Sequence, residues 1–142
     1  MANPRNTVAF EGIGEVLATF IIDNSTITFD DTKVGGSAAV GKAVEMSAAN
    51  TVALAADGAE VIGKLIKVSK DLKATVQIKG GMSLPGGNGA ALTVGKKIVG
   101  ALDAGAARGF IREVATGTAA ELGLARGFII DAGTPASTVV ML

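Results

Sequence analysis

The chain of 142 residues contains no histidine, no cysteine, no tyrosine and no tryptophan. The absence of histidine removes the side chain whose ordinary pKa best suits proton transfer near neutral pH. The absence of cysteine excludes disulfides, thiolate nucleophiles and zinc sites of the usual thiolate kind. Tyrosine and tryptophan are among the commonest interface anchors, and both are missing. These absences exclude the commonest enzyme classes and favour a structural or binding role.

Charge is also scarce in this chain. Thirteen basic and thirteen acidic residues cancel, and together they make up 18% of the sequence, against about 25% in typical soluble domains. A surface so poor in charge is often partly covered by a partner; the alternative is simply a soluble protein rich in alanine and glycine. A balanced charge provides no basic stripe for nucleic acid, so we expect no nucleic-acid partner.

Nothing near the start of the chain predicts a membrane segment. The longest apolar stretch there, residues 16–22, is too short to cross a bilayer. Residues 1–6 lack the charged-then-apolar layout of a signal peptide. We therefore expect no membrane partner and assembly in a cytosol.

The residues that are present favour β structure. Hydrophobic residues make up 49% and aromatics 4%, with 20 glycines, so the core must consist mainly of aliphatic side chains. Many short β-prone runs separated by turn residues predict an all-β fold, either a small barrel or a sandwich. We expect an extended N-terminal arm over residues 1–12 and a single β domain over residues 13–142. The predicted strands are residues 15–22, 26–29, 39–46, 51–54, 60–68, 74–79, 92–99, 108–115, 127–131 and 137–142.

Three local patterns predict more detail. Gly63 lies inside a strand-like run, which indicates a bulge or the close approach of another backbone. Residues 70–73 and 84–89 have the composition of loops. Thr118 and Glu121 fit a capping box, which predicts at most one short helix near residues 118–125, limited by Gly123.

No motif in the chain supports catalysis or cofactor binding. The glycine-rich segments 12–14, 41–42 and 86–89 fail the nucleotide-binding patterns. Asp30 and Asp31 point to opposite faces if extended, which makes a poor acid–base pair, and two carboxylates do not supply the six or more oxygens that calcium prefers. The lysines are expected on solvated strand faces, although a nucleophilic lysine or a Ser–Lys pair stays an open alternative: Lys64, Lys67, Lys70, Lys73 and Lys79. We expect a non-enzyme with no catalytic residue, cofactor or metal.

Several stretches resemble the head decoration, or capsid cement, proteins of tailed bacteriophages. The resemblance covers residues 12–142 approximately and rests on strand-and-turn patterns: GSAAVGKAV (36–44), TVALAADG (51–58), VIGKL (61–65), ATVQIKG (74–80), LPG (84–86), VGKKIVG (94–100), ARGFIID (125–131) and TVVML (138–142). It implies a compact β domain on the outside of the phage head, which forms a homotrimer and binds the major capsid protein after the shell expands. An N-terminal arm often adds to that contact in this family. No site residue of the family transfers by motif.

The resemblance leads to the hypothesis of a virion protein that stabilises an expanded capsid. The predicted contacts with capsid protein are in the arm, with Phe10 as apolar anchor; an alternative is that Phe10 packs on its own domain. The predicted contact residues are Asn3, Pro4, Arg5, Asn6, Thr7, Val8 and Phe10. Other functions considered are a β domain of the phage tail or spike, and a small-molecule-binding β-barrel.

Overall fold

The computed structural model describes residues 14–87, 92–115, 119–134 and 137–142. The first five strands are β1 (Val16–Ile22), β2 (Ala43–Ala48), β3 (Thr51–Leu54), β4 (Gly63–Val68) and β5 (Lys73–Lys79). The later strands are β6 (Gly81–Leu84), β7 (Ile98–Asp103), β8 (Ala107–Glu113), β9 (Phe128–Thr134) and β10 (Ser137–Met141). The helical segments are η2 (Val34–Gly36), η3 (Ala104–Ala106) and α1 (Ala119–Leu124).

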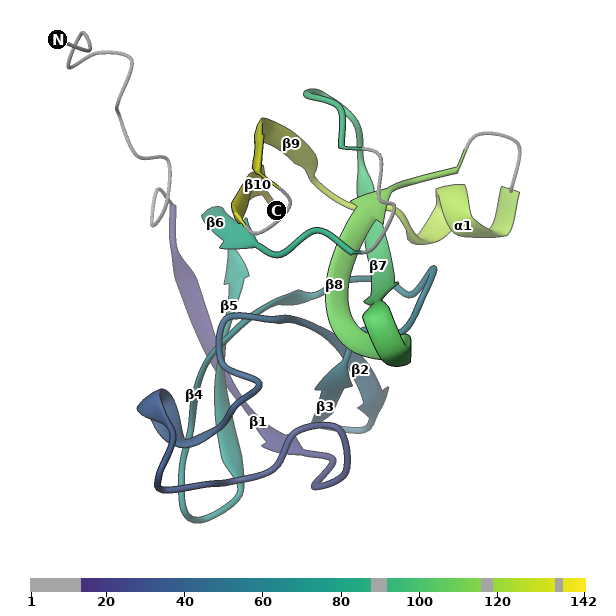
Figure 1. Cartoon of the computed structure of the whole chain (residues 1–142). Helices are drawn as coiled ribbons and strands as arrows, with labels where there is room; N and C mark the ends of the chain where they lie inside the picture. The colour runs from purple at the N-terminus through teal and green to yellow at the C-terminus, as the bar shows by residue number, and fades with distance from the viewer. Residues whose placement is uncertain (1–13, 88–91, 116–118, 135–136) are drawn as a thin grey trace, which may run out of the picture.

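The first five strands close into a barrel in the order β1-β3-β2-β4-β5, with β5 returning to β1 (Figure 1). The pairings are antiparallel except that of β1 with β3, which is parallel and joins Ile21 to Thr51 and Ile22 to Val52. The prediction of an all-β fold with a small barrel is therefore confirmed.

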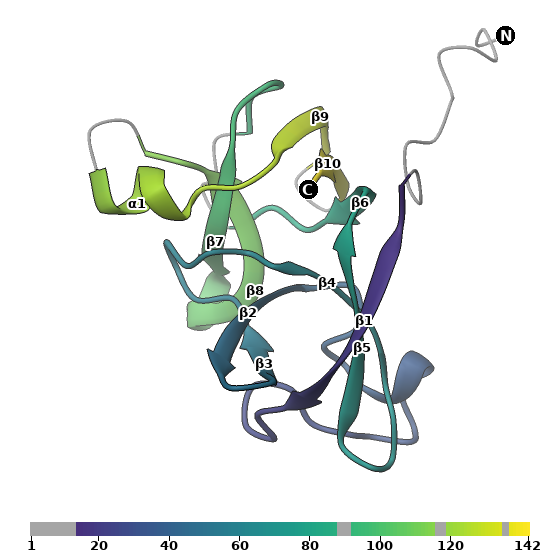
Figure 2. The same cartoon turned by 180° about the vertical axis from the view of Figure 1, so that it is seen from behind.

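The second half of the chain packs on one end of the barrel (Figure 2). It contains the sheet β6-β10-β9 and the ribbon β7-β8, with α1 to one side. Backbone hydrogen bonds join it to the barrel: the Gly58 amide donates to the Gly100 carbonyl at 2.9 Å, and the Gly109 amide donates to the Ala55 carbonyl at 3.0 Å.

Two clusters of aliphatic side chains form the core. The barrel cluster includes the fully buried Leu65, Val52 and Val76. The second cluster includes Leu84 and Ile111. The aromatic side chains near the barrel cluster, Phe20 and Phe29, are only partly buried. The expectation of a core built from small aliphatic residues is confirmed.

The neighbouring backbone leaves no room for a side chain at Gly63. A Cβ placed there would lie 2.0 Å from the carbonyl oxygen of Gln77 on the neighbouring strand. The predicted close approach of another backbone is confirmed, although Gly63 is the first residue of β4, with no strand over residues 60–62.

Two predicted strands are wrong. Residues 26–29 form no strand, because the Asp23 carboxylate accepts hydrogen bonds from the amides of Thr26 and Ile27, both at 2.9 Å, and the chain bends over residues 24–27. Residues 92–97 are not a strand either, because the chain turns at residues 94–95, where Gly95 has φ +87°. The strand predicted over 39–46 begins only at Ala43.

The predicted short helix is confirmed as α1, and the capping box predicted at its start depends on Thr118. Thr118 lies outside the described residues. The Glu121 carboxylate accepts hydrogen bonds from Arg112 and from the amide of Ala115. Its described partners are therefore on and just after β8.

Candidate interaction surface

Along most of β1, the described strands pair with only one of its two backbone edges. β1 pairs with β5 from Val16 to Ile21, but with β3 only at Ile21 and Ile22. The Ile21 amide donates to the Asn50 carbonyl at 2.8 Å, and Asn50 is in the turn that joins β2 to β3. Before Ile21, β1 therefore continues past the tip of the β2–β3 hairpin, and no described strand pairs with it on that side.

The side chains of this strand are unusually exposed for apolar residues. Val16 is 44% exposed, and Leu17 and Ile21 are each 49% exposed. The alternation of side chains along a strand places Leu17 and Ile21 on the face opposite Phe20. Since water orders around such aliphatic groups at a cost in free energy, covering this face would be favourable.

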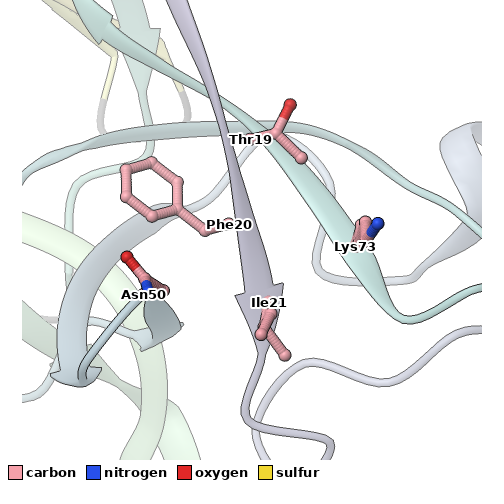
Figure 3. Close-up of a pocket in the computed structure, with 5 residues that line it drawn as sticks. All are labelled: Thr19, Phe20, Ile21, Asn50 and Lys73. Carbon is pink, nitrogen blue, oxygen red and sulfur yellow. The ribbon is translucent and has the colours of Figure 1, made fainter.

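Two grooves lie against β1. The first has a volume of about 160 Å³ and is lined by Thr19, Phe20, Ile21, Asn50 and Lys73. Figure 3 shows Phe20 and Asn50 on one side of β1, with Thr19 and Lys73 on the other. The groove therefore follows the strand where the pairing with β3 ends.

The second groove is more apolar and has a volume of about 270 Å³. It is lined by Phe20, Met46, Ile62, Ile78, Lys79 and Arg126. Phe20 lines both grooves. We call the two grooves, together with the edge of β1 on which no described strand pairs, the β1 surface. Lys73, Lys79 and Arg126 provide positive charge at its rim.

A third groove, of about 420 Å³, lies on another part of the barrel. Lys33, Lys67 and Lys70 line it together with Asp31 and the partly buried Phe29. Of the lysines expected on solvated strand faces, Lys67, Lys70, Lys73 and Lys79 are exposed, and Lys64 is partly buried.

A cluster of three charged residues joins β8, α1 and the segment before β4. Arg112 on β8 forms a two-pronged ion pair with Glu121 on α1 at 2.6 and 2.9 Å, and a further ion pair with Asp57 at 3.0 Å. The hydrogen bonds from Arg112 lower the pKa of Glu121 to about 2. The same bonds raise the pKa of Arg112 above its ordinary value. Both groups are therefore charged at neutral pH, which suits an ion pair better than a proton-transfer pair.

The predicted contact residues of the arm, from Asn3 to Phe10, lie outside the described residues. Of the other phenylalanines, Phe128 is exposed on β9, and Phe110 lies with its ring centre 5.4 Å from the Lys42 ammonium. Asp30 accepts hydrogen bonds from the amide and hydroxyl of Thr32, which lower its pKa.

Sequence reasoning missed the β1 surface. The sequence VLATFII does carry a signal, because apolar residues occupy both faces of a strand. That pattern normally predicts burial on both faces, whereas in the structure Leu17 and Ile21 are exposed on one face and no described strand pairs with one edge before Ile21.

Within the described ranges, no cluster of three or more acidic, histidine or cysteine side chains could hold a metal ion. No helix in the described part of the chain is both long and apolar enough to cross a membrane. No family model, curated protein or solved structure matches the chain.

Proposed function

We propose that this protein is a non-enzymatic structural protein of a tailed-phage virion. In this proposal it binds the major capsid protein on the outer surface of the expanded head and stabilises the shell. The observation that carries the proposal is the β1 surface, where a strand edge with no pairing partner among the described strands lies beside exposed aliphatic side chains. The resemblance of the sequence to head decoration proteins supplies the identity of the partner.

An open strand edge suits an extended segment of a capsid subunit. Such a segment can add to the edge through main-chain hydrogen bonds, while its side chains enter neighbouring grooves. Leu17 and Ile21 would be covered in the same contact. One such contact is modest, because it contains no tyrosine or tryptophan anchor. Repetition over a shell, and a homotrimer that carries three copies, would strengthen it through multivalency.

The arm is proposed as a second point of contact with the capsid protein. Its residues from Asn3 to Phe10 include one aromatic side chain among small and polar ones. Removal of residues 2–10 should weaken binding to expanded heads without unfolding the β domain.

A pair of matched substitutions tests the proposed surface. Leu17→Lys places a charge on the β1 surface, whereas Leu122→Lys places the same charge on α1, where the leucine is similarly exposed at 47%. Both variants are mixed with expanded heads that lack this protein, and co-sedimentation is measured. Leu17→Lys should reduce binding about tenfold or more, and Leu122→Lys should bind like the unchanged protein. Equal binding by both variants would argue against the β1 surface. No binding by the unchanged protein would argue against the function itself.

A further inference from the structure

The groove of about 420 Å³ on the barrel has a basic lining of its own. The described residues that line it include Lys33, Lys67 and Lys70, and one carboxylate, that of Asp31. All three lysines are exposed. The residues that line this groove differ from those of the two grooves beside β1. The groove therefore presents several positive charges at one place, although the chain as a whole has no net charge.

One wall of this groove is a loop closed by its own hydrogen bonds. The amide of Asp30 donates to the Gly36 carbonyl at 2.8 Å, and the amide of Gly36 donates to the Lys33 carbonyl at 3.0 Å. The Asp30 carboxylate accepts hydrogen bonds from the amide and hydroxyl of Thr32. A Cβ at Gly36 would lie 2.1 Å from the Val68 carbonyl oxygen, so the loop packs directly on β4 (Figure 1). The backbone that carries Lys33 is therefore held in place.

The other wall includes the hairpin that joins β4 to β5. The Ser69 amide donates to the Lys73 carbonyl at 2.8 Å, and the Leu72 amide donates to the Ser69 carbonyl at 3.0 Å. Lys70 lies within this tight turn, and the Asp71 carboxylate pairs with the Lys73 ammonium at 3.7 Å. Both walls are thus formed before any ligand binds, which reduces the ordering cost of binding.

The groove also offers apolar surface to a ligand. Phe29, which is partly buried against the barrel core, lines it. Val34 lies between the lining residues Lys33 and Gly35 and is 92% exposed. A ligand that combines negative charge with an apolar side chain would match both features of this surface.

These features favour an acidic protein segment over a phosphate backbone. A phosphodiester chain gains affinity by displacing counterions along a row of cations, whereas here Asp31 interrupts the lysines and would repel a phosphate. A protein segment can place carboxylates against the lysines and a backbone N–H donor against Asp31. It can also place an apolar side chain on the phenylalanine ring, which a phosphate backbone cannot.

We propose that this groove binds an acidic segment of a partner protein, with carboxylates against Lys33, Lys67 and Lys70 and an apolar side chain near Phe29. The charges are exposed, so the contact is modest by itself and weakens as salt is raised. The proposal does not depend on the capsid function proposed above, because it specifies the chemistry of the segment and not the protein that carries it.

NMR titration of the full-length chain tests the proposal. The probe is a blocked peptide of glutamates around one central leucine, and its control carries glutamines in place of the glutamates. At about 0.15 M salt, where screening acts over about 8 Å, the acidic peptide should shift the amide resonances of residues 30–36 and 67–70. The glutamine peptide should not. No binding of the acidic peptide, or shifts confined to other residues, would overturn the proposal.

Two pairs of substitutions separate the groove from general attraction. Lys67→Gln with Lys70→Gln removes two charges from the groove, whereas Lys96→Gln with Lys97→Gln removes two exposed charges from the segment before β7. The net charge changes equally in both variants. The groove pair should weaken binding of the acidic peptide about fivefold or more, and the control pair should stay within about twofold of the unchanged protein. Equal weakening by both pairs would overturn the assignment to the groove.

A phosphate probe decides between the two classes of anion. A short oligothymidylate with the same net charge as the acidic peptide should bind more weakly than the peptide. Tighter binding of the oligothymidylate, lost in Lys67→Gln with Lys70→Gln, would overturn the acidic segment in favour of a phosphate ligand. Because these measurements use the free protein and do not involve phage heads, their failure would leave the capsid hypothesis untouched.

Discussion

Gly63 illustrates how a single residue constrains the barrel. A Cβ at this position would lie 2.0 Å from the carbonyl oxygen and 2.8 Å from the carbonyl carbon of Gln77. The obstacle is backbone, which cannot rotate away as a side chain does. The β4–β5 pairing therefore depends on the absence of a side chain at Gly63, and this constraint is visible in the sequence as a glycine within a strand-like run.

Gly63→Ala should destabilise the protein by about 3 kcal/mol, because strands β4 and β5 must separate to admit the methyl group. Gly123→Ala is the matched control, since Gly123 lies in α1 and a Cβ there would meet nothing within 4 Å. That control should be stabilising by about 0.5–1 kcal/mol, because alanine is the better helix former. Urea unfolding measures both changes. A neutral Gly63→Ala variant would contradict the packing described at β4.

At the scale of elements, one ion pair attaches α1 to the ribbon. Arg112 and Glu121 are nine positions apart in the sequence, and Asp57, the third member, is 55 positions from Arg112. No local pattern joins residues at such separations, so sequence reasoning did not predict this ion pair. The pairing depends on the folded arrangement of β8, α1 and the segment that precedes β4.

This ion pair predicts a pH dependence of stability. The pKa of Glu121 is about 2 in the folded protein and 4.5 ordinarily, so the unfolded chain binds more protons between these values. The stabilisation is complete above about pH 4.5 and is lost as the pH falls toward 2. Glu121→Gln should therefore lose less stability than the unchanged protein between pH 5 and pH 2.5, as measured by urea unfolding. Identical losses would show that the carboxylate of Glu121 contributes nothing to the acid sensitivity.

The strands show what sequence patterns can and cannot predict. β1, β3, β5, β8 and β10 were predicted nearly as they are, because each combines β-prone residues with flanking turn residues. The strand predicted over residues 26–29 is wrong although polar and apolar residues alternate there. The Asp23 carboxylate accepts hydrogen bonds from the amides of Thr26 and Ile27 instead. The edge of β1 on which no described strand pairs before Ile21 could not be predicted from the sequence. It arises because β1 extends past the end of the β2–β3 hairpin.

At the scale of the whole molecule, the two core clusters belong to one connected structure. β5 and β6 are separated by Gly80 alone, and the Gly80 amide and carbonyl both bond to Leu142 at the end of the chain, at 3.3 and 3.2 Å. Further bonds from Gly58 and Gly109 join the barrel to β7 and β8. These connections join the two clusters, while the single β domain over residues 13–142 stays a prediction.

Two substitutions test whether the two core clusters unfold together. Leu65→Ala opens a cavity in the barrel cluster, and Leu84→Ala opens one in the second cluster. Each should destabilise by about 2–5 kcal/mol and shift one common transition, seen alike by circular dichroism and calorimetry. Leu72→Ala, at an exposed position, should change stability by less than about 0.5 kcal/mol. Two separate transitions, each sensitive to one variant, would contradict a single cooperative unit.

The lack of histidine, cysteine, tyrosine and tryptophan limits how the whole molecule can bind a partner. In the proposed function, adhesion comes from strand edges and aliphatic faces, of which β1 presents the clearest case among the described residues. Contacts of that kind are individually weak, so they suit a protein present in many copies on a repeating surface.

Electron microscopy of phage heads with added protein tests the central proposal most directly. Heads assembled without the protein are compared before and after expansion, each with and without the purified chain. The proposal predicts regularly repeated additional density on the outer surface of expanded heads, with β1 toward the capsid subunits, and none on unexpanded heads. Bare expanded heads at saturating protein, or density confined to the tail, would contradict it.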